Sequence, residues 1–153
     1  MRTAEAILRD TGWDDLEHAC GPASDAPGRL AALLSEDPEA CGDALGFLDS
    51  ALLHQGSVCS ATLPAAELVA AVLDDPRVGV PCESALPWDE RERPLRAALL
   101  EWLGAFAESV TWDDEDEDDE EDEDDPWVAG RLLLPDLFDR VAPFLDDTDP
   151  AVR

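Results

Sequence analysis

Apolar residues recur with the spacing of an α-helix over most of the chain. Four long segments show this period, at 37–55, 65–75, 91–110 and 132–145, and a shorter one covers 29–35. No segment alternates apolar and polar residues as a half-exposed strand would. The pattern therefore predicts an all-α domain. The apolar stripes consist of Cys41, Leu45, Leu48 and Leu52; Leu68, Val69, Val72 and Leu73; Leu95, Leu99, Trp102, Leu103, Phe106 and Val110; and Leu134, Leu137, Phe138, Val141 and Leu145.

Asp-Pro pairs recur at a regular distance along the chain. Asp37-Pro38, Asp75-Pro76 and Asp149-Pro150 are separated by 38 and then 74 residues, so the second interval is close to twice the first. Aspartate can cap the free N–H groups of a helix start, and proline at the first helical position loses no hydrogen bond. A period of about 40 residues with two helices is typical of HEAT and armadillo solenoids. We therefore expect a short HEAT-like α-solenoid of antiparallel helix pairs, with an irregular helical bundle as the alternative.

This period divides a single domain, residues 1–153, into successive units. We expect an N-terminal lead-in or cap at 1–36, a first repeat at 37–76, and a second repeat at 77–148 that contains an acidic insert. Residues 149–153 match the start of a truncated repeat.

Two geometric expectations follow from the repeat assignment. Loops 56–64 and 111–130 each join the two helices of one pair, so they should emerge from the same edge of the solenoid. Residues 148–153 should be irregular, because so short a segment cannot offset the cost of nucleating a helix. The apolar side of the helix at 132–145 should then be exposed, since no further repeat covers it.

Two stretches also resemble a known family. Asp-Pro-Ala-Val-Arg at 149–153 is similar to the opening of a HEAT-repeat helix, and residues 37–76 resemble an actinobacterial group of HEAT-repeat proteins. The shared features are a His-Gln-Gly turn after the first long helix, a small polar loop and an Ala-rich second helix; residues 13–27 resemble the lead-in of that group. Cys20 and Cys59 stand where the group usually has an aromatic residue. The resemblance implies a non-enzymatic protein-binding scaffold of a class that includes some members of bacterial toxin-immunity loci.

Charge limits the choice of partner. The chain has 38 acidic and 10 basic residues, all ten of them Arg, and a formal net charge of −28. Nucleic-acid binding requires a cationic face, and anionic lipid attracts basic residues, so we expect neither as a partner. A protein with a basic surface is the natural partner. The N-terminus has no apolar stretch of signal-peptide length, which favours a cytoplasmic protein. The chain is rich in Ala, Leu, Asp and Pro and has no Lys or Tyr, a composition typical of translation from GC-rich DNA, which suggests a bacterial protein.

Residues 113–125 form an uninterrupted run of thirteen acidic residues, called here the acidic run. Adjacent like charges disfavour compact structure, so we expect a solvated, disordered loop anchored at its ends by Trp112 and Trp127. It could mimic a polyanion in a basic cleft of a partner, serve only to keep the protein soluble, or bind cations weakly. The expected partner-binding residues are Trp112, Asp113, Asp114, Glu115, Asp116, Glu117, Asp118, Asp119, Glu120, Glu121, Asp122, Glu123, Asp124, Asp125 and Trp127, together with His54 and Gln55.

The sequence offers little support for catalysis or for a cofactor. It lacks P-loop, GxGxxG, GxSxG and HExxH patterns. His54 and Cys59 have the residue types of a Cys–His pair, and His18 and Cys20 could join them as zinc ligands if two loops meet. A loop packed by its own hydrogen bonds explains the same residues. We therefore expect no enzyme, no cofactor and no bound metal. The leading hypothesis is an inhibitor or immunity-type protein whose acidic run engages a basic surface; the alternatives are a generic scaffold with a solubilising insert and a metal-binding helical protein.

Overall fold

The described part of the protein is predominantly helical. The computed structural model describes residues 2–82, 93–112 and 124–152. It contains 72% helix and 6% strand, which confirms the all-α prediction. The strands are two antiparallel pairs of two residues each, too short to form a layer of the fold. They are Glu17–His18 (β1) with Gly21–Pro22 (β2), and Pro81–Cys82 (β3) with Arg93–Pro94 (β4).

The N-terminal segment is more structured than its apolar pattern predicts. Helix α1 (Ala4–Asp10) is capped by Thr3, whose hydroxyl accepts the N–H of Ala6, and it buries Ile7 in the core. The expected short helix at 29–35 corresponds to α2 (Ala26–Leu30) and the 3-10 turn that follows it at Ala31–Leu34.

The two central helices match the prediction in type and differ in their ends. Helix α3 (Pro38–Phe47) is capped by Asp37 and continues as a π-helical turn, Leu48–Leu52, so the predicted helix at 37–55 changes its pitch near its end. Helix α4 (Thr62–Val72) begins three residues before the predicted segment at 65–75 and is followed by a 3-10 turn, Pro76–Gly79.

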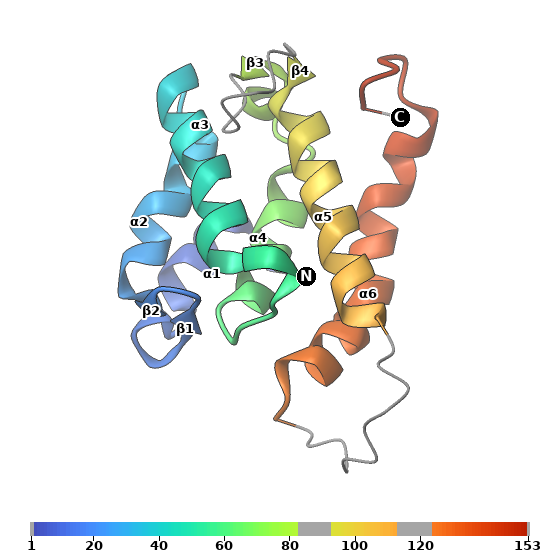
Figure 1. The fold of residues 1–153 in the computed structure, drawn as a ribbon. Coiled ribbons are helices and arrows are strands. Elements are labelled where there is room, and N and C mark those ends of the chain that lie inside the picture. The colour runs from blue at the N-terminus through green and yellow to red at the C-terminus, as the bar shows by residue number, and fades with distance from the viewer. Residues whose placement is uncertain (1, 83–92, 113–123, 153) are drawn as a thin grey trace.

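The last two helices are long and antiparallel (Figure 1). Helix α5 (Leu95–Thr111) buries all six residues of its predicted apolar stripe. Helix α6 (Pro126–Val141) begins six residues before the predicted segment because Asp125 caps it. It ends two residues before Pro143, and the chain continues as the 3-10 turn Ala142–Asp146.

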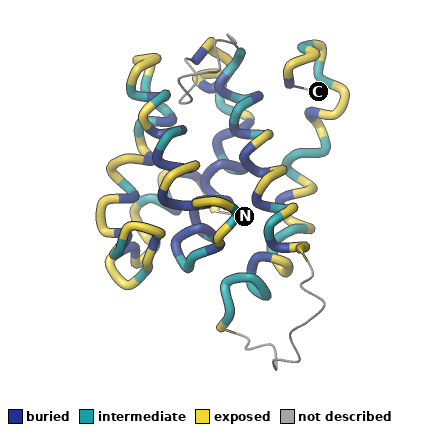
Figure 2. Tube along the Cα trace, viewed as in Figure 1, coloured by how far each residue is buried: buried dark blue, intermediate teal, exposed yellow. Residues whose placement is uncertain are grey.

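The helices form two layers around one core (Figure 1). Helices α2, α3, α5 and α6 follow one another from left to right in the view, with contacts between α2 and α3, between α3 and α5, and between α5 and α6. Helix α4 lies behind α3 and α5 and contacts α1, α5 and α6. It is the most deeply buried helix, as Figure 2 shows by its dark blue colour.

Helix α6 and the residues after it are less covered by the rest of the chain. Residues 147–152 form turns without a regular helix, as expected. Within the predicted apolar stripe, Phe138 and Leu145 are exposed and Leu137 is buried, so the expected apolar surface on this helix is present only in part. None of the helices in the described ranges is both long and apolar enough to cross a membrane. Residues 113–123 of the acidic run lie outside the described residues.

Asp75 should make folding stability depend on acidity. Its carboxylate accepts the N–H of Arg77 at 2.9 Å and pairs with the guanidinium of Arg77 at 2.7 Å. These bonds lower the pKa of Asp75 to about 2, so the folded state holds this proton less tightly than the unfolded state. The resulting stability is present above about pH 4 and is lost as the pH falls toward 2. Because water screens the pair, we expect about 1 kcal/mol.

Urea unfolding at about pH 5 and about pH 2.5 measures this effect, and Asp75→Asn is the matched variant, because asparagine keeps the cap without the charge. The variant should lose less stability between the two pH values than the native protein. An equal loss in both proteins would show that Asp75 does not contribute to this dependence.

Candidate functional site

A groove beside the ends of α3, α5 and α6 brings together two segments that the sequence analysis singled out. Its volume is about 650 Å³. Gln55 and Gly56 come from the polar turn after α3, whereas Trp112 and Trp127 border the acidic run. The described ends of the two loops therefore meet at one edge of the molecule, as the repeat assignment requires (Figure 1). We call this the tryptophan groove; it is lined by Asp49, Leu53, Gln55, Gly56, Ala105, Glu108, Ser109, Trp112 and Trp127.

Backbone geometry holds the polar turn against α5. Gln55 and Gly56 have φ angles of 51° and 80°, in the left-handed region that residues with a Cβ rarely adopt. A Cβ added at Gly56 would lie 3.4 Å from the hydroxyl of Ser109, so glycine also permits this close approach. The buried hydroxyl of Thr62 accepts the N–H of Cys59 and donates to the carbonyl of Leu52, which ties the two ends of the loop together.

The two tryptophans are fixed by the ends of their helices. Trp112 follows the last residue of α5, donates its N–H to the carbonyl of Ser109, and is 71% exposed. Trp127 lies in the first turn of α6, where its N–H donates to the carboxylate of Asp125 at 2.9 Å. The Nε of Arg131 donates to the carbonyl of Val110 at 3.0 Å and holds the start of α6 beside the end of α5.

The groove is acidic. Asp49 and Glu108 line it, and partial desolvation raises the pKa of Asp49; Glu101 raises it further, while Arg93 lowers it. A nearby cation would therefore stabilise the charged form of Asp49. The arginines in the described part of the chain are already engaged by carboxylates or carbonyls. They are Arg2, Arg9, Arg29, Arg77, Arg93, Arg96, Arg131 and Arg140.

The structure gathers only part of the predicted site. Gln55, Trp112 and Trp127 line the groove, whereas the exposed His54 is not among its lining residues. Asp125 caps α6, so this member of the acidic run has a structural role. Its other described member, Asp124, is exposed.

Two carboxylates of the groove were missed by the sequence analysis. Glu108 lies off the apolar stripe of α5, so the sequence indicates an exposed acid at this position. It does not show which residues Glu108 faces. Asp49 lies in the π-helical turn after α3, and the pattern of apolar residues gives no signal for such a turn.

The chain was compared with protein families, curated proteins and solved structures. No family model, curated protein or solved structure matches it.

The His and Cys residues do not form a metal centre in the described part of the chain. No group of three or more His, Cys, Asp or Glu side chains there is arranged to hold a metal ion. The Nε2 of His18 lies 2.9 Å from the carboxylate of Asp25, and its Nδ1 accepts the N–H of Cys20, so both ring nitrogens are engaged. Burial raises the pKa of the Cys59 thiol, and Glu17 adds to the effect. A thiol held in this way is a poor nucleophile at neutral pH.

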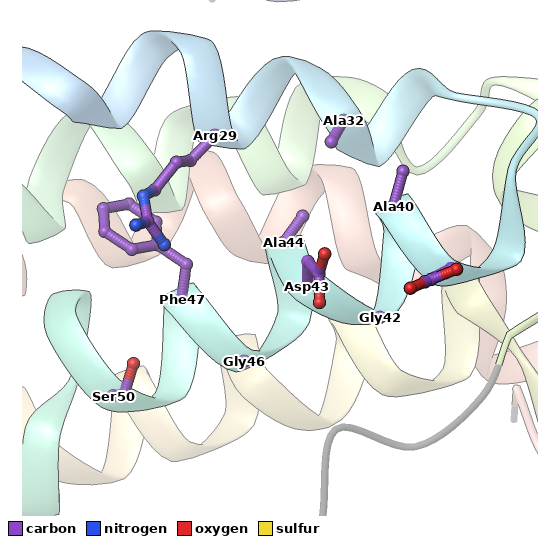
Figure 3. A pocket seen from close by; sticks show the side chains of 10 residues that line it. Arg29, Ala32, Ala40, Gly42, Asp43, Ala44, Gly46, Phe47 and Ser50 are labelled. Carbon is purple, nitrogen blue, oxygen red and sulfur yellow. The ribbon is translucent and has the colours of Figure 1, made fainter.

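A second groove, of about 850 Å³, lies between α2 and α3 (Figure 3). Small residues such as Ala32, Gly42 and Gly46 form much of its surface. The guanidinium of Arg29 lies 5.0 Å from the centroid of the Phe47 ring and 3.4 Å from the carboxylate of Asp25, so it is already occupied. This groove lacks the exposed aromatic anchor of the tryptophan groove, and we regard the tryptophan groove as the stronger candidate site.

Proposed function

We propose that the protein is a non-enzymatic binding module that recognises a basic protein surface through the tryptophan groove and the acidic run. In the specific form of this hypothesis it is an intracellular inhibitor or immunity-type protein. One observation carries the proposal. Trp112 and Trp127, which flank the acidic run in the sequence, line one groove together with two carboxylates, Asp49 and Glu108.

The chemistry of the groove suits an arginine or lysine side chain. A cation over a tryptophan face gains about 0.5–1 kcal/mol at an exposed site and more when it is desolvated. Carboxylates beside the ring can accept charge-assisted hydrogen bonds from the same group. The excess of negative charge on the chain would attract a basic partner over a longer range and speed its association.

The arrangement of helices supports a HEAT-like solenoid as part of this proposal. In such a fold α3 and α4 would be the first pair and α5 and α6 the second. The first helices of the two pairs, α3 and α5, are in contact, and so are the second helices, α4 and α6. Repeat proteins commonly bind partners through surfaces built from several units, and the tryptophan groove draws residues from both proposed pairs.

Replacement of the exposed tryptophan tests the groove. We expect Trp112→Ser to weaken binding of a short peptide of alternating arginine and glycine by about tenfold, because the substitution removes the aromatic face that a guanidinium would contact. Isothermal titration calorimetry at about 50 mM salt measures the affinity, since exposed charges act over a longer range there.

Leu132→Ser is the matched control, because Leu132 is 77% exposed on α6 and does not line the groove. It should leave the affinity within about twofold of the native value. Equal binding by the native protein and Trp112→Ser would exclude the tryptophan groove as the binding site. The hypothesis of a generic scaffold would then remain.

A further inference from the structure

A third groove, which is apolar, lies between α5 and α6. Its volume is about 310 Å³, and all of its lining residues are apolar. It is distinct from the tryptophan groove, because the two grooves use different faces of α5. Ala105 and Glu108 line the tryptophan groove, and Leu100 and Gly104 line this one. We call it the α5–α6 groove; it is lined by Leu100, Leu103, Gly104, Ala107, Leu134, Leu137, Phe138 and Val141.

The residues that α6 contributes have the spacing of a helix-packing seam. Leu134, Leu137, Phe138 and Val141 are separated by intervals of three, one and three, which places them on one side of the helix. Phe138 is 63% exposed, so a large apolar side chain of the groove faces solvent. Exposed apolar surfaces that are rimmed by polar residues are typical of interaction sites.

The groove suits a helix better than a small metabolite. Pockets for small molecules combine apolar walls with a few polar groups that fix the orientation of the ligand. The lining of this groove supplies no polar side chain for that purpose. A neighbouring pair of helices with an apolar furrow is instead the geometry that receives the apolar face of an amphipathic helix.

Charge decides between the occupants. Glu101 and Glu108 are exposed on α5, and Asp136 and Asp139 are exposed on α6. The two arginines of α6 are engaged elsewhere: Arg131 by the carbonyl of Val110, and Arg140 by the carboxylate of Asp74 at 4.0 Å. A second copy of this chain would bring another −28 against the same helices, which opposes self-association.

We propose that the α5–α6 groove binds an amphipathic helix of a partner protein, with its apolar stripe in the groove and lysine or arginine on its flanks. This surface is additional to the tryptophan groove and does not require the acidic run.

A helical peptide of leucine and lysine is the probe, with leucine at positions i, i+3, i+4 and i+7 and lysine elsewhere. Binding is measured at about 300 mM salt, where exposed charges are largely screened, so that apolar contacts dominate. We expect Gly104→Gln to weaken binding by about tenfold, because its side chain would enter the groove. An added Cβ at Gly104 meets no atom within 4 Å, so the variant should fold.

Each variant has a matched control. Gly28→Gln introduces the same side chain on α2, where an added Cβ also meets nothing within 4 Å, and should bind like the native protein. Phe138→Ser should lose binding, whereas Leu132→Ser, exposed on α6 outside the groove, should retain it. At about 300 mM salt a shuffled peptide of equal charge should bind less tightly. A peptide with the same stripe and glutamate for lysine is compared at about 50 mM salt, where charge acts over a longer range, and should bind less tightly there.

Several results would overturn the proposal. Native affinity in Gly104→Gln would exclude the α5–α6 groove as the binding site. Equal binding of the shuffled peptide would show that charge alone, without the apolar stripe, accounts for the interaction. Equal binding of the glutamate peptide would exclude a basic partner. A native dimer in sedimentation experiments that Gly104→Gln dissociates would assign the groove to a second copy. Loss of peptide binding in Trp112→Ser but not in Gly104→Gln would place the peptide in the tryptophan groove, leaving the proposed function intact.

Discussion

Substitution of Gly130 by alanine should destabilise the protein, whereas the same substitution at Gly104 should stabilise it. A Cβ at Gly130 would lie 2.6 Å from the Cγ1 of Val110 and 3.4 Å from the Cζ of Phe106. Both residues are fully buried, and a β-branched valine cannot easily turn away. We expect the free energy of unfolding to fall by about 1–3 kcal/mol, despite the better helix propensity of alanine.

Gly104 supplies the control on a neighbouring helix. Its added Cβ meets nothing within 4 Å, so Gly104→Ala should raise the free energy of unfolding by about 0.5–1 kcal/mol. Urea unfolding followed by circular dichroism compares the two variants, and a second substitution, Val110→Ala, should recover part of the loss in Gly130→Ala through a coupling between neighbours. If Gly130→Ala is as stable as Gly104→Ala, α6 does not approach α5 as closely as the structure indicates.

The close approach at Gly130 explains why the contact between α5 and α6 could not be derived from the sequence. The spacing of apolar residues predicts α5 well, because one face of that helix is buried along its whole length. On α6 the same spacing mixes buried Leu137 with exposed Phe138, so the stripe alone does not identify the core-facing side. The buried Gly130 marks that side, but a single glycine in a helix gives no such signal in isolation.

The Asp-Pro pairs are a local signal in the structure. Asp37, Asp75, Asp125 and Asp149 each accept a backbone N–H from the residue two positions later. Two of these caps open the long helices α3 and α6, one opens a 3-10 turn, and the last opens an irregular turn. Asp125-Pro126 had no place in the repeat register, yet it predicts the start of α6. The pairs therefore report helix and turn starts, and their spacing alone does not establish a repeat.

The site was predictable where its residues border a distinctive segment. Trp112 and Trp127 could be expected near the protein body because they flank the acidic run, and the small polar turn stood out between two apolar helices. Asp49 and Glu108 could not be assigned to the groove, because their position depends on how α3 and α5 pack. Periodicity along one helix does not contain that information.

Neutralising residues 113–123 with serine and glycine should slow the binding of a basic peptide by about one to two orders of magnitude at low salt. The substitution removes eleven acids and changes the formal net charge from −28 to −17. A concentrated field raises the association rate of an oppositely charged partner by about 10- to 1,000-fold, and the effect declines steeply with salt. Stopped-flow fluorescence can follow binding of the arginine and glycine peptide, because the exposed Trp112 immediately precedes the acidic run in the sequence.

The substitution should stop before Asp125, because this residue caps α6 and its loss would change the groove as well as the charge. Asp125→Ser is the control for that role, since serine can keep the cap while removing one charge, and it should retain nearly native association. In the native protein the rate should fall steeply between about 50 and 300 mM salt, and in the neutralised variant the dependence should be much weaker. A native rate and salt dependence in the variant would assign the acidic run to solubility, because eleven adjacent acids that steered a partner could not be replaced without slowing its arrival.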